Sequence, residues 1–160
     1  NKKVNKNVRY NAVIANQTYN KDFLEGKTPG EYGVLNSTIA VLDLSYRIKK
    51  GHTIRFETQA LFSKQLESAS KEAEGDWLMA LAEYTISPNW FFAIQDMYNY
   101  GNENESKRLH YMNLNVGFLK GSTRFEIGYG KKREGIFCVG GVCKLVPSSN
   151  GLNLSITTSF

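Results

Sequence analysis

The chain has 160 residues with 41% apolar content, which suits one domain with a real core, and we expect a single domain over residues 1–160. Its 20 basic and 15 acidic residues leave a net charge of +5 but are interspersed without a dense basic stripe, so nucleic acid is not an expected partner. The longest apolar runs, Trp77 to Ala82 and Trp90 to Ile94, have six and five residues, whereas a membrane-spanning helix needs about 20, which excludes helical spans.

Apolar and polar residues alternate with a period of two in blocks of about ten residues along the chain, and this pattern predicts an all-β fold. In each regular block one face is apolar and ionised groups lie on the other. The last block is the clearest, with Leu152, Leu154 and Ile156 opposite Asn153 and Ser155. We expect eight strands, at Val8 to Tyr19, Leu42 to Ile48, Ile54 to Phe62, Leu78 to Ile86, Trp90 to Tyr98, Tyr111 to Phe118, Arg124 to Tyr129 and Leu152 to Phe160.

The fifth block does not alternate, because Trp90 to Ile94 are all apolar. The pattern therefore assigns no faces to this strand, and a β-bulge is one explanation.

The connections between the blocks alternate between long and short. Three are tight, at Lys49 to Gly51, Ser87 to Asn89 and Lys120 to Gly121. The others are long, at Asn20 to Val34, Lys64 to Asp76, Asn99 to Lys107 and Lys131 to Asn150. Transmembrane β-barrels have short periplasmic turns and long extracellular loops. In a soluble β-sandwich or lipocalin-like barrel, nothing requires short and long connections to lie at opposite ends of the strands.

The strand lengths fit the same architecture, since ten residues rising ~3.3 Å each and tilted ~40° span roughly 25 Å, the height of a lipid-facing band. We therefore expect an antiparallel up-and-down transmembrane β-barrel with about eight strands in this chain. Its apolar faces would contact lipid and its polar faces the lumen. A soluble all-β protein with the opposite arrangement is the alternative.

The terminal segment resembles the β-signal by which bacterial outer-membrane barrels are recognised for assembly, since an amphipathic strand ends on an aromatic residue. Its signal residues would be Leu152, Leu154, Ile156 and Phe160. The resemblance implies the barrel-assembly machinery as a partner, an outer-membrane location in a Gram-negative bacterium, periplasmic short turns and extracellular long loops. Trp77 would then lie near the outer interface, and Trp90, Tyr46 and Tyr84 near the inner one.

Acidic and basic residues together occupy the predicted lumen face and would form a packed polar plug by pairing with one another. A selectivity ring is the alternative. The set comprises Arg9, Asp43, Arg47, Arg55, Glu57, Gln59, Glu83, Arg124 and Glu126.

The segment Cys138 to Cys143 predicts a hairpin with a Gly140-Gly141 turn, which places the two sulfurs across from each other within disulfide reach. A disulfide implies an oxidising, extracytoplasmic compartment. A redox or metal-binding pair is the alternative, although a metal site normally needs four ligands. We expect no metal and no cofactor.

Catalysis has little support in the sequence, and we expect no enzyme. The chain has two histidines, His52 and His110, and neither has a nucleophile or carboxylate at a spacing that identifies a site. Two carboxylates, those of Asp76 and Asp96, are expected to approach the loop end of the barrel.

The run Arg133 to Pro147, followed by the terminal strand, resembles the C-terminal end of uncharacterised outer-membrane β-barrel proteins of Bacteroidota. Those proteins are longer, and the chain has no starting Met, so we expect either a processed chain or the C-terminal part of a larger barrel, whose first strand would pair with further strands. The resemblance supplies no catalytic residues.

The expected function is a structural or interaction component of an outer-membrane complex, with Asn20 to Val34 and the bridged hairpin contacting partner proteins. Lipid and lipopolysaccharide would surround it. A porin-like passive channel for small solutes is the alternative, and a hydrolase at the rim is a third reading. Because an eight-stranded barrel holds only side chains, closure within this chain would argue against the channel.

Overall fold

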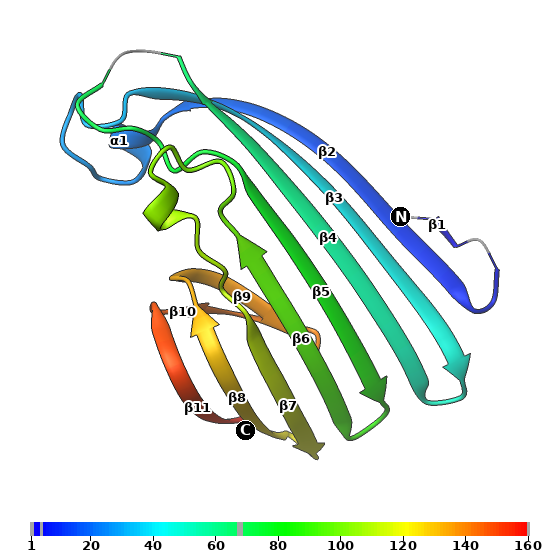
Figure 1. Cartoon of the computed structure of the whole chain (residues 1–160). Coiled ribbons are helices and arrows are strands. Elements are labelled where there is room, and N and C mark those ends of the chain that lie inside the picture. Colours follow the sequence, from blue (N-terminus) through cyan, green and yellow to red (C-terminus); the bar gives the residue numbers. More distant parts are fainter. Residues whose placement is uncertain (1, 4, 67–68, 160) are drawn as a thin grey trace.

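The computed structural model describes residues 2–3, 5–66 and 69–159. Nearly all of the fold is one antiparallel β-sheet, in which each strand pairs with the next along the chain up to β8, and β8 then pairs with β11. The hairpin β9–β10 forms a second, two-stranded sheet (Figure 1). The strands are β1 (Lys2–Lys3), β2 (Val8–Asn20), β3 (Val34–Lys49), β4 (His52–Gln65), β5 (Trp77–Ile86), β6 (Trp90–Tyr98), β7 (Asn113–Lys120), β8 (Thr123–Lys132), β9 (Gly135–Val139), β10 (Val142–Val146) and β11 (Ser149–Thr158).

The all-β prediction is confirmed, and each of the eight predicted blocks lies within or overlaps a strand of the main sheet, β2 to β8 and β11. The sheet is not closed. Its order runs from β1 to β11 without returning, so β11 has only β8 beside it among the described residues. A closed barrel is therefore not seen within the described part of this chain.

Strand β6 is regular, and the bulge suggested for it is wrong. Its residues pair in unbroken register with β5 and with β7. Trp90 and Phe92 lie exposed on one face of the sheet, and Phe91 and Ala93 lie buried on the other, so both faces of this strand carry apolar side chains. The irregular register lies instead in β3, between Arg47 and Lys49, beside the first tight turn.

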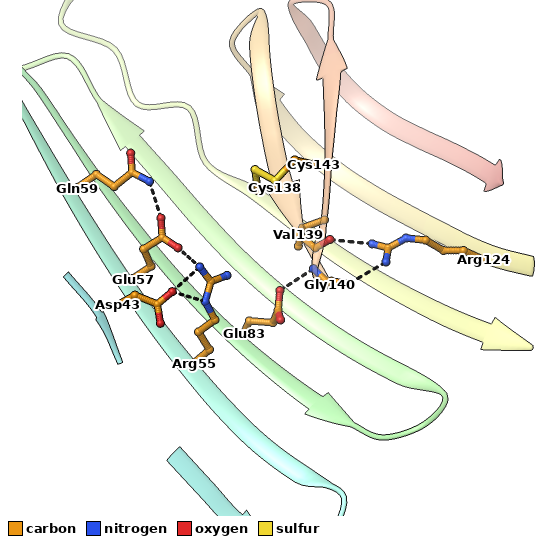
Figure 2. Close-up of a disulfide and its surroundings, with 10 residues drawn as sticks. All are labelled: Asp43, Arg55, Glu57, Gln59, Glu83, Arg124, Cys138, Val139, Gly140 and Cys143. Carbon is orange, nitrogen blue, oxygen red and sulfur yellow. Dashed lines mark hydrogen bonds and ion pairs between the residues drawn. A yellow bond between two sulfur atoms is a disulfide. The ribbon is translucent and has the colours of Figure 1, made fainter. Parts of the chain in front are cut away.

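The register gives the sheet two chemically different faces, which we call convex and concave. Glu83 on β5 and Arg124 on β8 both point to the tip of the β9–β10 hairpin, from opposite sides in Figure 2. The hairpin therefore lies inside the curve of the sheet, and the face that carries these residues is the concave one. The convex face carries the alternate residues of every strand.

The short turns lie at one end of the strands, the turn end, and the long connections at the other, the loop end (Figure 1). The connection after β2 contains the short helix α1 (Lys21–Leu24), and the connection after β6 contains the 3₁₀ turn η1 (Glu105–Lys107). Across the described part of the chain, none of the helices has the length and apolar composition needed to cross a membrane.

Gly117 on β7 is required by the close approach of β6. A Cβ built on Gly117 would overlap the Phe91 ring, which is almost fully buried beneath the hairpin. We expect Gly117→Ala to lower the free energy of unfolding by about 1–3 kcal/mol, because the ring has no space to move into. Denaturant unfolding measures this loss. Adding Phe91→Leu to the same variant should recover part of it, and a double variant no more stable than Gly117→Ala alone would contradict this packing.

Candidate functional site

The predicted hairpin and disulfide are confirmed. Cys138 on β9 lies directly opposite Cys143 on β10, and their sulfurs are bonded. The turn between the strands is Gly140-Gly141, with φ values of 57° and 75°. Two successive residues with positive φ define the tight hairpin turn whose twist matches the strands, which explains the two glycines.

The expectation that this hairpin reaches outward to partner proteins is wrong. Its tip is held against the concave face by two opposed groups (Figure 2). The Gly140 N–H donates to Glu83 Oε2 over 2.6 Å. Arg124 donates from Nη2 to the Val139 carbonyl over 2.9 Å and from Nη1 to the Gly140 carbonyl over 3.0 Å. A guanidinium presents several donors in a fixed plane, so one side chain satisfies both carbonyls of the turn.

Apolar side chains fill the space between this hairpin and the middle of the sheet. They come from β5, β6 and β9, and the cluster comprises Met79, Leu81, Phe91, Ala93, Phe137 and Val139. The lumen-face prediction did not foresee this core. Its signal was present, since Met79 and Leu81 share their face with Glu83, but single apolar residues on a polar face do not show what covers them.

The predicted lumen residues form two separate ionic groups on the concave face. Arg55 bonds Asp43 and Glu57, and Glu57 also accepts a hydrogen bond from Gln59. The second group joins Glu126, which is 7% exposed, to Arg124 and to Lys144 of the hairpin, at 3.2 and 3.3 Å.

Three members of the predicted set take no part in these groups, and one of them, Glu83, accepts from the Gly140 N–H instead. Arg9 and Arg47 are exposed and lie together near the turn end, lining a separate hollow. Packed polar groups of the kind expected for a plug therefore occur on the concave face only beneath and beside the hairpin.

A cavity of about 530 Å³ lies between the first ionic group and the hairpin. Its charged wall is formed by Arg55, Glu57 and Glu83, and Gln59 and Gln95 add amides. The rest of the lining is apolar or sulfur-containing: Met79, Leu81, Met97, Ile136, Cys138, Val139, Gly141 and Cys143. A few convergent polar groups in an apolar hollow of this size are typical of small-molecule sites.

The convex face is a broad apolar surface. Leu114, Ile127 and Ile156 are 52%, 46% and 70% exposed, and Trp90 and Tyr46 are also exposed. Apart from Lys49 and Lys120 at the turns themselves, the convex positions of β2 to β8 and β11 carry no Asp, Glu, Lys or Arg as far as Ile14, Ala40, Phe62, Leu78, Ile94, Leu114, Tyr129 and Leu152. Asp96 follows on β6, opposite Ala80. Water-exposed faces of monomeric proteins rarely carry so large an apolar patch.

The terminal-strand residues Leu152, Leu154 and Ile156 lie on this convex face of β11, and all three are exposed. Phe160 lies outside the described residues. The placement expected for Trp77 is wrong, because its ring is buried on the concave side under the Arg133 guanidinium, 4.3 Å from its centroid. Trp90 lies at the turn end of the convex face as expected, packed on Phe118.

The convex face becomes polar at the loop end of β2 and β3. Asn16 donates to Thr38 Oγ1 and Asn36 donates to Thr18 Oγ1, each over 2.8 Å. This ladder lies beyond the apolar surface on strands of 13 and 16 residues. The two strands therefore project past the apolar region.

The connection from β2 to β3 is ordered by Asp22. Its buried carboxylate accepts hydrogen bonds from the backbone N–H groups of Gly30, Tyr32 and Gly33 at 2.8–3.0 Å. Desolvation acts to raise the pKa of Asp22, but these amide bonds outweigh it and the pKa is lowered from its ordinary value of 3.8. Beside this loop, Phe23 is 91% exposed.

Replacing Asp22 should open this loop. Asp22→Asn removes the charge that the three amides solvate, so we expect faster amide exchange at Gly30 to Gly33 at neutral pH. In the unmodified protein the ionised carboxylate stabilises the loop fully above its ordinary pKa, and this stabilisation is lost as the pH falls below 3.8 through the lowered pKa. Exchange measured across this pH window, corrected for intrinsic rates, tests both statements. Unchanged protection in Asp22→Asn would contradict them.

Both histidines have defined partners. His110 Nδ1 lies 2.7 Å from Asp96 Oδ2 near the loop end, and its ring stacks on Tyr98. His52 Nδ1 lies 2.6 Å from the Tyr84 hydroxyl near the turn end. Asp76 accepts from the Ser63 backbone N–H instead of approaching His110. In the described part of the chain, no Ser, Thr or Cys side chain is hydrogen bonded to either imidazole.

The protein is thus an all-β protein in which a disulfide-bridged hairpin is folded into the curve of an open antiparallel sheet. The chain belongs to the family of unknown function DUF6029, whose model matches residues 1–160. No curated protein and no solved structure matches it.

Proposed function

We propose that this chain forms wall and plug of an outer-membrane β-barrel and serves as a structural or interaction component of an outer-membrane complex. The observation that supports it is the distribution of polarity over the two faces. Ile127 and Leu154, neighbours on β8 and β11, are exposed on the convex face, while Glu126, which precedes Ile127 in the sequence, is buried on the concave face. Lipid is the solvent that favours this arrangement, since it solvates apolar side chains and excludes charges.

The height of the apolar surface supports a membrane span. Along β3, β4 and β5 it covers about nine residues, and at ~3.3 Å each and ~40° tilt they rise roughly 23 Å, near the ~25 Å of a lipid-facing band. Aromatic residues border it at the turn end, where Tyr46, Tyr84, Trp90 and Phe118 lie. The polar ladder of Asn16 and Asn36 would then stand above the outer surface.

A sheet in hydrocarbon must close, because unpaired backbone groups have no water to bond there. The free edge of β11 and the edge at β2, where only Lys2–Lys3 pairs, therefore need further strands. We propose that these strands come from a longer form of the same chain.

In the proposed barrel, the hairpin on the concave face plugs the lumen. The loop end supplies the contacts with other members of the complex. Phe23 and Leu24 are exposed there, beyond the polar ladder of β2 and β3, and in a barrel they would lie above the membrane, within reach of a partner protein. The passive channel remains the second candidate, supported by the cavity beside the hairpin.

Fractionation of a producing cell and planar-bilayer recording test these roles. We expect the native protein in the outer-membrane fraction, with mobility in SDS gels that changes on heating, and no stepwise conductance after reconstitution. Recovery in a soluble fraction would contradict the membrane assignment. Stepwise openings would reject the plugged anchor and support the channel. A Phe23→Ser variant should lose co-purifying outer-membrane proteins, and an unchanged set would reject the role of this loop.

A further inference from the structure

We infer that the cavity between β4–β6 and the hairpin binds a small organic cation, a primary amine with an aliphatic chain. This inference goes beyond the proposed function and does not depend on the membrane assignment. Three features of the cavity carry it: an excess of carboxylates, a buried acceptor without a donor, and an apolar floor.

The carboxylates outnumber the cation on this wall. Glu57 and Glu83 line the cavity with Arg55, and Asp43 pairs with the same guanidinium from outside the lining. Three negative charges and one positive charge therefore leave a formal charge of −2 on this group. Arg124 does not compensate them, because it binds the hairpin carbonyls and Glu126. A poorly hydrated site with uncompensated charge favours a ligand of opposite sign.

Gln95 shows which chemistry the ligand must offer. Its side chain lines the cavity from the middle of β6 and is 7% exposed. Its Oε1 is buried and accepts no hydrogen bond from any residue that the structure describes. A buried acceptor without a donor costs about 1–3 kcal/mol, so a bound N–H donor would remove this penalty once the Gln95 amide turns its Oε1 toward the cavity.

Glu83 offers a second acceptor on the same wall. One of its carboxylate oxygens accepts from the Gly140 N–H, which leaves the other for a ligand. An ammonium group has three donors and can bond Gln95 and a carboxylate together.

The remaining lining selects an organic cation over a metal ion. Met79, Leu81, Met97 and Ile136 present apolar surface suited to a short methylene chain. Among the described residues, no group of three or more His, Cys, Asp or Glu side chains could hold a metal ion. The cavity therefore offers acceptors for an amine together with apolar surface for its methylene chain.

Calorimetric titration of the purified, disulfide-intact protein with 1,5-diaminopentane tests this inference, with 1-pentanol as the neutral analogue and glutarate as the anionic one. We expect saturable binding of the diamine only. Gln95→Leu and Glu57→Gln should each weaken it about fivefold to tenfold, the effect of one lost hydrogen bond or charge contact. Gln17→Leu, on the same concave face but exposed and outside the cavity, should leave it unchanged.

Each other outcome overturns the inference. Absence of saturable diamine binding rejects the site, and equal binding of 1-pentanol shows a purely apolar hollow. Unchanged affinity in both Gln95→Leu and Glu57→Gln places the amine elsewhere. Matching denaturation midpoints for these variants and the parent protein establish that a loss of binding is not a loss of folding. Membrane fractionation reports on the proposed function separately.

Discussion

Arginine in place of Ile127 is expected to lower the free energy of unfolding in a lipid bilayer by about 2–4 kcal/mol. Ile127 lies in the middle of the convex face, between Val116 of β7 and Leu154 of β11. If lipid covers this face, the new guanidinium must be desolvated or must distort the bilayer to reach water. Guanidinium titration of protein refolded into phosphatidylcholine vesicles, followed by gel mobility without heating, measures the loss.

The matched control for this variant is Asn150→Arg. Asn150 lies on the same convex face of β11 at the loop end, beside Lys131 and beyond the apolar surface, and it is exposed. We expect a change within about 0.5 kcal/mol there, as for ordinary surface substitutions. Equal, small effects of both variants would contradict a lipid-covered face, since a half-exposed isoleucine in water tolerates arginine.

Loss of Arg124 is expected to have the second large effect. Its side chain is 11% exposed and bonds Glu126, the Val139 carbonyl and the Gly140 carbonyl, with its guanidinium 4.2 Å from the centroid of the Phe91 ring. Arg124→Met leaves the buried Glu126 with Lys144 as its remaining cation and two carbonyls without donors. Removing one partner of a buried ion pair typically costs about 3–5 kcal/mol.

Denaturant unfolding measures this loss, and amide exchange at Val139 to Val142 should show the hairpin tip released from the sheet. Arg47→Met is the control, because Arg47 is exposed at the turn end of the same concave face. Adding Glu126→Gln to Arg124→Met should lower the stability further, since it removes the ion pair that Glu126 keeps with Lys144. A loss no greater than that of Arg47→Met would contradict the role of Arg124 in holding the hairpin.

The strands could be predicted from the sequence because the two faces of each regular strand have different surroundings. Apolar and polar residues therefore alternate along the strand, as they do in Leu42 to Ile48. The faces of β6 could not. Phe91 packs under Val139, which is nearly fifty residues away in the chain. Only the folded hairpin explains why both sides of β6 are apolar.

The hairpin itself was predictable from Cys138, Cys143 and two glycines, since its contacts are local. Its direction was not, because Glu83 and Arg124 belong to distant strands that meet at its tip. Likewise, charge alternation placed Asp43, Arg55 and Glu57 on one face, but it could not separate them from Arg9 and Arg47. Whether the sheet closes into a barrel depends on how its edge strands pair, and side-chain patterns carry no information about that pairing.

In the proposed barrel, acyl chains contact the convex face and water contacts the concave one. Spin labels on single cysteines at Leu44, Val116 and Leu154, and at their concave neighbours Ser45 and Asn153, test it most directly in vesicles, since Cys138 and Cys143 are bonded to each other. We predict that oxygen, which concentrates in lipid, relaxes the first three labels and that an aqueous nickel chelate relaxes the other two. Relaxation of the convex labels by the nickel chelate, or equal relaxation at all five sites, would contradict the account.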